Sequence, residues 1–304
     1  MADGELRRIG VPLTSLSGIF RPRRRHILPR GSGSCRIRTV VFWDLANVSF
    51  CVLASGSSGN AALLGTDQTR ILIDAGLSMK ELSRRLGRMG EELERLDAIL
   101  ITHEHADHVA GLPVLARNQK VRARIYLTRL TAPAIDWGEA QPSLETFQAG
   151  AQFRIGDINV TSFSVPHDAV DPVAFCFEMR GVRIGVATDL GYIPASIKYH
   201  LRRTDLLLLE SNHDLDMLKV GPYPWATKQR VMSRVGHLSN LGMSDYLIED
   251  LDAATDRLVL GHLSEHNNHP EIVRLVATQA LEERGLRTQL SIASQREASE
   301  VFRF

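Results

Sequence analysis

The stretch Thr102-His103-Glu104-His105-Ala106-Asp107-His108 decides the fold and the chemistry that this 304-residue sequence predicts. Three histidines and one aspartate stand within six positions, directly after the apolar, strand-length run 96–102. So many ionisable groups in a strand-to-helix turn are costly for folding unless something compensates them. Neutral imidazole nitrogens and carboxylate oxygens are ligands for zinc, manganese or iron, so the stretch predicts a metal site.

The spacing within this stretch divides the candidate ligands into two sets. In a partly extended turn, His103 and His105 point in one direction. Asp107 and His108 stand at the start of the expected helix and point in another. The spacing therefore predicts two metal ions side by side.

Further metal ligands are expected where other strands end. His167, Asp189 and His262 each follow a short apolar run. In layered α/β folds, sites form just past the carboxyl ends of strands, where loops converge. A single histidine or aspartate in such a place is more often a helix cap or a surface residue. Together with the histidine-rich stretch, the three residues favour a metal site.

The composition is that of a soluble globular protein, with 44% hydrophobic and 23% charged residues. The longest apolar run, residues 40–54, is broken by Asp44 and Asn47 and falls short of the roughly 20 apolar residues that cross a bilayer. We therefore expect no contact with a membrane. The three cysteines are widely spaced and form neither a disulfide framework nor a zinc pattern, which favours a reducing, cytoplasmic location.

Strands and helices alternate irregularly after residue 48, which predicts layered sheets flanked by helices. The expected strands are 50–54, 61–65, 70–74, 96–102, 123–127, 159–165, 173–179, 182–188, 206–210, 257–261 and 289–293. One helix is expected to begin at Ser78, with Glu81 completing a capping box. The other expected helices are 110–118, 225–235, 241–251 and 270–284.

Residues 1–48 differ from the rest in charge and pattern. They hold nine arginines, no lysine and three acids, a net charge of +6, whereas the remaining residues sum to −5. They lack helical or strand periodicity and contain three prolines and the linker-like run 31–34. We interpret them as a mostly disordered extension from a start codon assigned too early, followed by one folded domain over 49–304. A basic arm that grips nucleic acid and an organelle transit peptide are the alternatives.

The H-x-H-x-D-H run, the turn 74–76 and the later His167, Asp189 and His262 together resemble the five-motif signature of the metallo-β-lactamase superfamily. The sequence is similar in particular to the bacterial YycJ (WalJ) branch. The segments that carry this similarity are 52–60, 74–78, 166–168, 187–192, 210–214, 236–240 and 262–268. The resemblance extends from about residue 48 to the C-terminus. Members of the branch begin near Val48, which supports the start-codon interpretation.

The resemblance implies a four-layer αββα sandwich, an α/β fold of the α+β kind, for a hydrolase domain over 49–304. It also implies two divalent ions, zinc or manganese, with iron as a further option. One ion would be held by His103, His105 and His167, the other by Asp107, His108 and His262, with Asp189 bridging them. Asp74 would steady the turn that presents the histidines.

Members of the branch are associated with 5′-to-3′ DNA exonuclease activity, so the resemblance implies a phosphodiesterase with a nucleic-acid substrate, DNA. Two cations lower the pKa of a water between them and so supply a hydroxide for in-line attack on phosphorus, with Asp107 among the catalytic residues. His213 and His237 lie in polar loops and are candidate proton donors to the leaving oxygen. A structural hydrogen-bonding role is the alternative for each.

Two regions are candidate substrate contacts. The Gly- and Ser-rich turn 55–60 offers Ser57 and Asn60 to a phosphate. Basic and aromatic residues around the helix before His237 could bind nucleic acid; they include Tyr223, Trp225, Lys228, Arg230 and Arg234. For the first region the alternative is a tight turn that needs small residues, and for the second it is a solvent-exposed helix face. The negative charge of the folded part opposes nucleic-acid binding, although two divalent ions bring positive charge to the cleft itself.

Other hydrolases share this kind of site. A small cyclic phosphodiesterase and an RNase Z-like RNA-processing enzyme are the alternative activities. A metal-binding regulatory protein without turnover is the non-enzyme alternative, although seven ligand positions exceed the four that a structural zinc needs. The sequence leaves the oligomeric state open, a dimer included.

Overall fold

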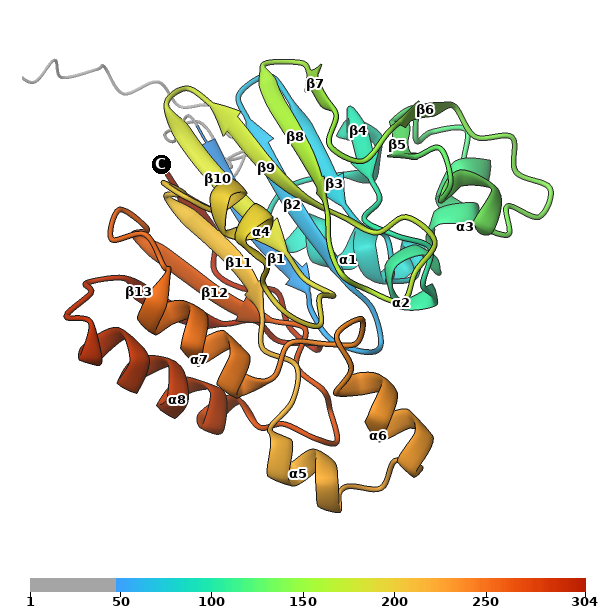
Figure 1. Cartoon of the computed structure of the whole chain (residues 1–304). Helices are drawn as coiled ribbons and strands as arrows, with labels where there is room; N and C mark the ends of the chain where they lie inside the picture. Colours follow the sequence, from blue (N-terminus) through green and yellow to red (C-terminus); the bar gives the residue numbers. More distant parts are fainter. Residues whose placement is uncertain (1–47) are drawn as a thin grey trace, which may run out of the picture. The chain divides into compact units, whose positions relative to one another are not determined.

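Two seven-stranded sheets form the centre of the computed structural model, which describes residues 48–304 (Figure 1). The first sheet has the order β14-β1-β2-β3-β4-β5-β6 and the second β13-β12-β11-β10-β9-β8-β7. The strands of the first sheet are β1 (Val48–Ala54), β2 (Ala61–Thr66), β3 (Arg70–Ile73), β4 (Ala98–Leu100), β5 (Arg124–Thr128), β6 (Leu144–Phe147) and β14 (Phe302–Arg303). Those of the second are β7 (Gln152–Ile155), β8 (Ile158–Ser164), β9 (Val173–Met179), β10 (Val182–Ala187), β11 (Leu206–Glu210), β12 (Arg257–Gly261) and β13 (Gln289–Ile292).

Eight α-helices of the described part accompany the sheets. They are α1 (Met79–Arg88), α2 (Ala106–Val109), α3 (Leu112–Arg117), α4 (Ala195–His200), α5 (Leu215–Val220), α6 (Trp225–Val231), α7 (Asn240–Glu249) and α8 (Pro270–Glu283). The predicted cap of α1 is present, because the Ser78 side chain accepts a hydrogen bond from the Glu81 amide at 3.3 Å. Helix α8 has the predicted proline at its first position and is followed by Gly285 at φ +62°.

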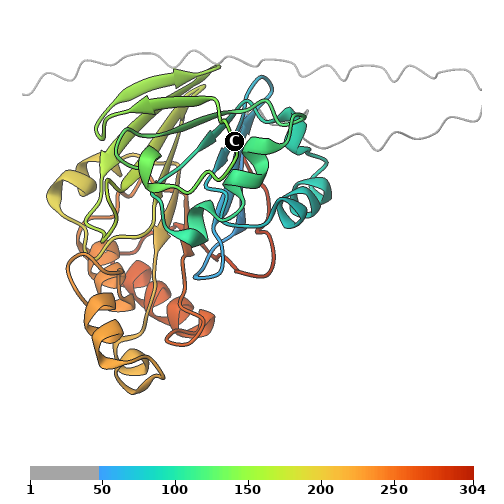
Figure 2. The ribbon, with the colours of Figure 1, turned by 90° about the vertical axis from the view of Figure 1, so that its right-hand side faces the viewer.

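Strand periodicity places the apolar side chains in separate layers. In β1, Phe50 and Val52 face the core between the two sheets, whereas Cys51 and Leu53 face the helices outside the first sheet. Helices α1 and α3 cover that outer face, and α4, α7 and α8 cover the outer face of the second sheet (Figures 1 and 2). The result is the predicted helix–sheet–sheet–helix sandwich.

The structure adds short elements to those that the sequence predicts: β6, β7, β14, α4 and α5. The expectations for residues 1–47 lie outside the described residues. Val48, which the sequence assigns to the extension, is the first residue of β1, and its backbone exchanges hydrogen bonds with Phe304. Within 48–304, no helix has the length and apolar character needed to cross a membrane.

A buried ion pair joins the first residue of β3 to the segment between α1 and β4. Arg70 Nε lies 3.0 Å from Glu91 Oε1, and both residues are buried. We expect Arg70→Met to lower the free energy of unfolding by about 3–5 kcal/mol, because Glu91 would keep a buried charge without its cation. Urea denaturation checks this, with the exposed Arg95→Met as a control that should change stability by less than about 0.5 kcal/mol. A loss below about 1 kcal/mol for Arg70→Met would contradict the argument.

Candidate metal centre

The candidate residues meet at one edge of the two sheets. Asp74 follows β3 and the stretch 102–108 follows β4, which runs parallel to β3. Asp189 and His262 follow β10 and β12, and Glu210 ends β11; these three strands are also parallel. Because the carboxyl ends of parallel strands meet at the same edge, their side chains converge. A pocket of about 370 Å³ lies there, which we call the metal pocket; it is lined by Ser57, His105, Ala106, Asp107, Asp189, Asn212, Tyr223, Thr227, Arg230, Val231, His237, His262 and Ser264.

One set of three histidines gathers at this pocket. His103 Nε2 lies 3.1 Å from His105 Nδ1, and that nitrogen lies 3.2 Å from His167 Nε2. The three ring nitrogens are therefore near enough to one another to bind a single ion. The opposite nitrogen of His167, Nδ1, lies 3.0 Å from the Gly236 carbonyl oxygen, which fixes the orientation of the ring.

A second set combines one carboxylate with two histidines. Asp107 Oδ2 lies 3.4 Å from His108 Nε2 and 3.3 Å from His262 Nε2. These three ligand atoms also lie near enough to one another to hold an ion. The structure thus brings together the two sets of ligands that the sequence separates by direction.

Asp189 lies between the two sets. Its Oδ2 is 3.3 Å from His108 Nε2, and its Oδ1 is 3.4 Å from His262 Nε2 and 3.8 Å from His167 Nε2. The carboxylate is 2% exposed, and its Oδ2 makes no hydrogen bond within the described structure. A buried carboxylate needs a compensating positive charge, which the surrounding imidazoles or a bound cation can supply. The donor set of imidazole nitrogens and carboxylate oxygens therefore fits a pair of divalent cations.

The carboxylates of the pocket favour the positively charged form of two of its histidines. Burial by itself lowers the pKa of His262, but the surrounding carboxylates, Asp189 first among them, outweigh burial and raise that pKa to about 10. The same balance raises the pKa of His108 well above its usual value. For His103, burial and the neighbouring rings hold the pKa well below its usual value, so the ring stays neutral, the form that binds metal.

Three residues of the site have a strained backbone. Asp74, Asp189 and His262 have φ values of +59°, +59° and +55°. A positive φ is uncommon for residues other than glycine and is stored where the surrounding structure requires it. Each lies just past the end of a strand, where the turn directs its side chain toward the others.

Asp74 supports the histidine-rich stretch, as the sequence predicts. Its Oδ1 accepts a hydrogen bond from the Thr102 amide at 2.9 Å, and its Oδ2 lies 2.8 Å from His108 Nδ1. The carboxylate therefore fixes both the backbone after β4 and the orientation of a ring whose other nitrogen faces Asp107 and Asp189.

Glu210 is a site residue that the sequence reasoning does not single out. It is fully buried, and its Oε1 lies 2.7 Å from His237 Nδ1 and 2.9 Å from His262 Nδ1. Its Oε2 accepts hydrogen bonds from the amides of Leu190 and Leu238. Burial by itself raises the pKa of the Glu210 carboxyl, but the charge of His237 and the hydrogen bonds from His237 and His262 lower it to about 2. The signal in the sequence is a charged residue that ends the apolar strand Leu206–Glu210.

The two candidate proton donors differ in their access to the pocket. His237 lines it, and its contact with Glu210 leaves one ring nitrogen available. His213 is 1% exposed, is not among the residues that line the pocket, and has no hydrogen-bond partner at either ring nitrogen within the described structure. Burial lowers the pKa of His213 to about 4, so at neutral pH the ring is not the imidazolium ion that a general acid requires. The structure favours His237 and not His213.

The candidate substrate contacts also differ in whether they line the metal pocket. Ser57 is exposed and lines the pocket. Asn60 is buried and donates to Asp107 Oδ2 at 3.1 Å, so it positions a candidate ligand rather than a substrate. Lys228 is 8% exposed and its Nζ donates to the Lys219 carbonyl, so it stabilises the region of α5 and α6.

Arg234 stacks on Tyr192, with its guanidinium carbon 4.1 Å from the ring centroid, and does not line the pocket. The cation at the pocket wall is Arg230, whose Nε pairs with Asp168 at 2.7 Å; Tyr223 also lines the pocket. Trp225, the other aromatic candidate, is 61% exposed at the start of α6 but does not line the pocket. The structure thus corrects the sequence prediction for Asn60, Lys228 and Arg234.

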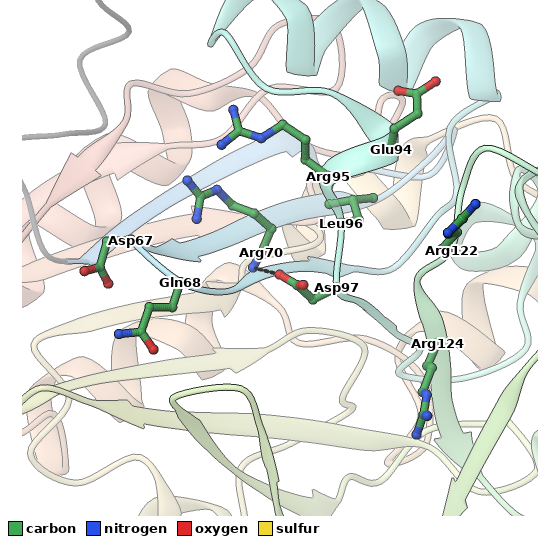
Figure 3. A pocket seen from close by; sticks show the side chains of 9 residues that line it. All are labelled: Asp67, Gln68, Arg70, Glu94, Arg95, Leu96, Asp97, Arg122 and Arg124. Carbon is green, nitrogen blue, oxygen red and sulfur yellow. Dashed lines mark hydrogen bonds between the residues drawn. The ribbon is translucent and has the colours of Figure 1, made fainter.

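A separate hollow lies at the other end of the first sheet, beside the first residues of β3, β4 and β5 (Figure 3). Its lining includes Arg70, Arg95, Arg122 and Arg124, with the Arg70 amide donating to Asp97. No histidine lines it. It shares no lining residue with the metal pocket.

Comparison with known proteins identifies the family. Residues 69–263 match the Beta-lactamase superfamily domain. Exodeoxyribonuclease YycJ of Bacillus anthracis is 38% identical over 243 residues, which cover 78% of this chain and 90% of that protein. The chain belongs to the metallo-β-lactamase superfamily.

Two further similarities support the same conclusion. Exodeoxyribonuclease WalJ of Streptococcus pneumoniae strain D39 is 38% identical over 237 residues, 76% of this chain and 87% of that protein. The resemblance to the YycJ (WalJ) branch is thereby confirmed. The metallo-β-lactamase fold protein YhfI of Bacillus subtilis superposes with a TM-score of 0.65 at 19% identity, covering 83% of this chain and 99% of that one. This superposition confirms the superfamily fold.

Proposed function

We propose that the chain is a dinuclear metal-dependent phosphodiesterase, and specifically a 5′-to-3′ DNA exonuclease. The observation that carries the proposal is the position of Asp189 between two ligand sets, with its Oδ2 buried and without a hydrogen bond. The similarity to two exodeoxyribonucleases supports DNA as the substrate. Cys51 and Cys176 are free thiols, which supports a reducing, cytoplasmic location.

The candidate ligands fall into two sets, one for each cation. In this proposal one cation would be held by His103, His105 and His167 and the other by Asp107, His108 and His262, and Asp189 would be shared between them. Zinc or manganese suits these ligands, with iron as a further option. A pair of divalent cations supplies Lewis acidity at the phosphate oxygens and acidifies a water molecule for in-line attack.

The protein's own groups supply positioning and a proton. Glu210 and Asp74 hold the rings of His262 and His108 through the nitrogens turned away from the pocket. His237, held by Glu210, donates a proton to the oxygen that leaves phosphorus. Arg230 and Ser57 stand at the pocket wall where they can bind the non-bridging oxygens.

A substrate panel tests the proposed activity. Zinc- or manganese-loaded protein is incubated with a fluorescent 5′-phosphorylated DNA duplex, an RNA hairpin and bis(p-nitrophenyl) phosphate. We expect mononucleotides to be released from the 5′ end of the DNA. Preference for the RNA would favour an RNase Z-like enzyme, and activity on the small diester alone a cyclic phosphodiesterase. Inertness on all three would favour a binding protein.

Metal removal is expected to destabilise the protein as well as inactivate it. If each ion is present at about 1,000 times its dissociation constant, it contributes about 4 kcal/mol, so chelation should lower Tm by at least about 10 °C. Differential scanning fluorimetry and elemental analysis measure this, and addition of two equivalents of zinc should restore Tm. A Tm that is the same with and without bound metal would contradict the proposal.

A further inference from the structure

A second cavity, of about 570 Å³, opens beside the metal pocket. We call it the side cavity; its lining includes Ser57, Leu263, Ser264, Arg274, Ile292 and Arg296. Ser57 and Ser264 line both hollows, so the two share a boundary. The side cavity lies within the volume range of pockets that hold small ligands. A chain molecule bound at the metals can therefore continue directly into it.

The wall of the side cavity combines an apolar surface with a cationic rim. Leu263 and Ile292 supply apolar surface. Arg274 projects from α8 with a side chain that is 48% exposed and lies no nearer than 3.9 Å to its acidic neighbour Glu271. Arg296 pairs with Glu265 at 3.1 Å, an exposed contact that is weak in water. An apolar surface with guanidinium groups at its edge suits a planar base joined to a phosphate.

The loop between the two hollows is fixed in place. Gln295 accepts a hydrogen bond from the Ser58 amide at 2.9 Å and donates one to the Gly59 carbonyl at 2.9 Å. Gly56 has φ +150°, and a side chain there would meet Gln295 at 2.6 Å. The hydroxyls of Ser57 and Ser58 have no hydrogen-bond partner within the described structure, so the loop offers both to a ligand.

We propose that the side cavity holds the nucleotide next to the scissile phosphate, with the adjoining phosphate at Arg274 and Arg296 and the base against Leu263 and Ile292. The proposal rests on the phosphodiesterase function above and names the part of the substrate that lies beyond the metals. A nucleotide fits because neighbouring phosphates of one strand are one nucleotide apart, and the two hollows are neighbours that share Ser57 and Ser264.

Binding and its salt dependence test the side cavity. The metal-loaded protein is titrated into a fluorescein-labelled phosphorothioate oligonucleotide, which resists cleavage, and anisotropy is followed at several salt concentrations. The double variant Arg274→Ala/Arg296→Ala is expected to bind about 10-fold more weakly and to reduce the slope of log K against log[salt] by about 0.7, because both arginines contact one phosphate. The exposed Arg287→Ala is the matched control and should leave both quantities unchanged. An unchanged affinity and slope in the double variant would overturn the proposal.

A kinetic ratio separates this proposal from the function on which it rests. Bis(p-nitrophenyl) phosphate has a single phosphate and no base, so it can use the metal pocket alone. The ratio of kcat/KM on the oligodeoxynucleotide to kcat/KM on the small diester should fall about 10-fold in the double variant. An unchanged ratio would remove the side cavity from the substrate path. Wild-type protein that cleaves neither substrate would instead remove the proposed function.

Discussion

Replacing Asp189 with asparagine is expected to lower phosphodiesterase activity by at least about 10³-fold on every substrate, while the fold is retained. Asp189 is the residue whose carboxylate faces ring nitrogens of both ligand sets, His108 and His262 on one side and His167 on the other. Asparagine keeps the shape of the side chain but loses its charge and replaces one carboxylate oxygen by an NH2 group, which cannot bind a cation. The variant should therefore lose its second metal equivalent together with its activity.

The measurement for Asp189→Asn combines elemental analysis with kcat/KM on the small diester and on DNA. Circular dichroism checks that the variant is folded. Asp245→Asn, an exposed position on α7, is the matched control and should keep two equivalents of metal and full activity. If Asp189→Asn bound two equivalents and turned over like wild type, no shared carboxylate would be needed and the dinuclear scheme would fail.

The sequence predicts the ligands well because their signal is local. The spacing of His103, His105, Asp107 and His108 gives two directions without knowledge of the fold. In the structure His103 and His105 fall in one possible ligand group and Asp107 and His108 in another, while His103 and His108 also meet in a third group with Asp189. His167, Asp189 and His262 follow apolar runs, and the carboxyl ends of the strands bring them to the same edge.

Glu210 is harder to predict because its role depends on distant partners. It contacts His237 and His262, which are 27 and 52 positions away in the chain. A carboxylate at the end of a buried strand is stable only where hydrogen-bonding or cationic side chains from other segments contact it. One sequence does not show that β11 pairs with β12, which brings His262 to Glu210. The family resemblance includes the segment 210–214, but it gives Glu210 no role.

Lys228 and β6 show two other limits. A lysine on a short helix is expected to be an exposed cation. Lys228 instead donates a hydrogen bond to the Lys219 carbonyl, because the turn between α5 and α6 brings the two residues together. Strand β6 lies at a sheet edge, and Phe147 is its one buried residue, so the strand has too little periodic signal to be predicted. In both cases tertiary contacts decide the outcome.

Replacing His237 with alanine is expected to slow DNA cleavage by about 10²- to 10⁴-fold, the range typical of a lost general acid. The sugar oxygen that leaves phosphorus is a strong base and needs the proton that His237 supplies. p-Nitrophenolate is a far weaker base and leaves without one. Hydrolysis of bis(p-nitrophenyl) phosphate should therefore fall by less than about 10-fold in the same variant, so the two substrates respond differently.

The metal content of the variant distinguishes a proton-donor role for His237 from a role as a metal ligand. His237 Nδ1 lies 3.8 Å from Asp189 Oδ1, near enough for the ring to belong to a ligand set with Glu210 and His262. If His237→Ala lost one metal equivalent and both substrates slowed equally, the residue would be a ligand and not a proton donor. Glu210→Gln should slow DNA cleavage by about 10- to 100-fold and should also slow hydrolysis of the small diester, because this carboxylate orients both His237 and the candidate ligand His262. The exposed His266→Ala is the matched control and should leave both rates and both metals unchanged.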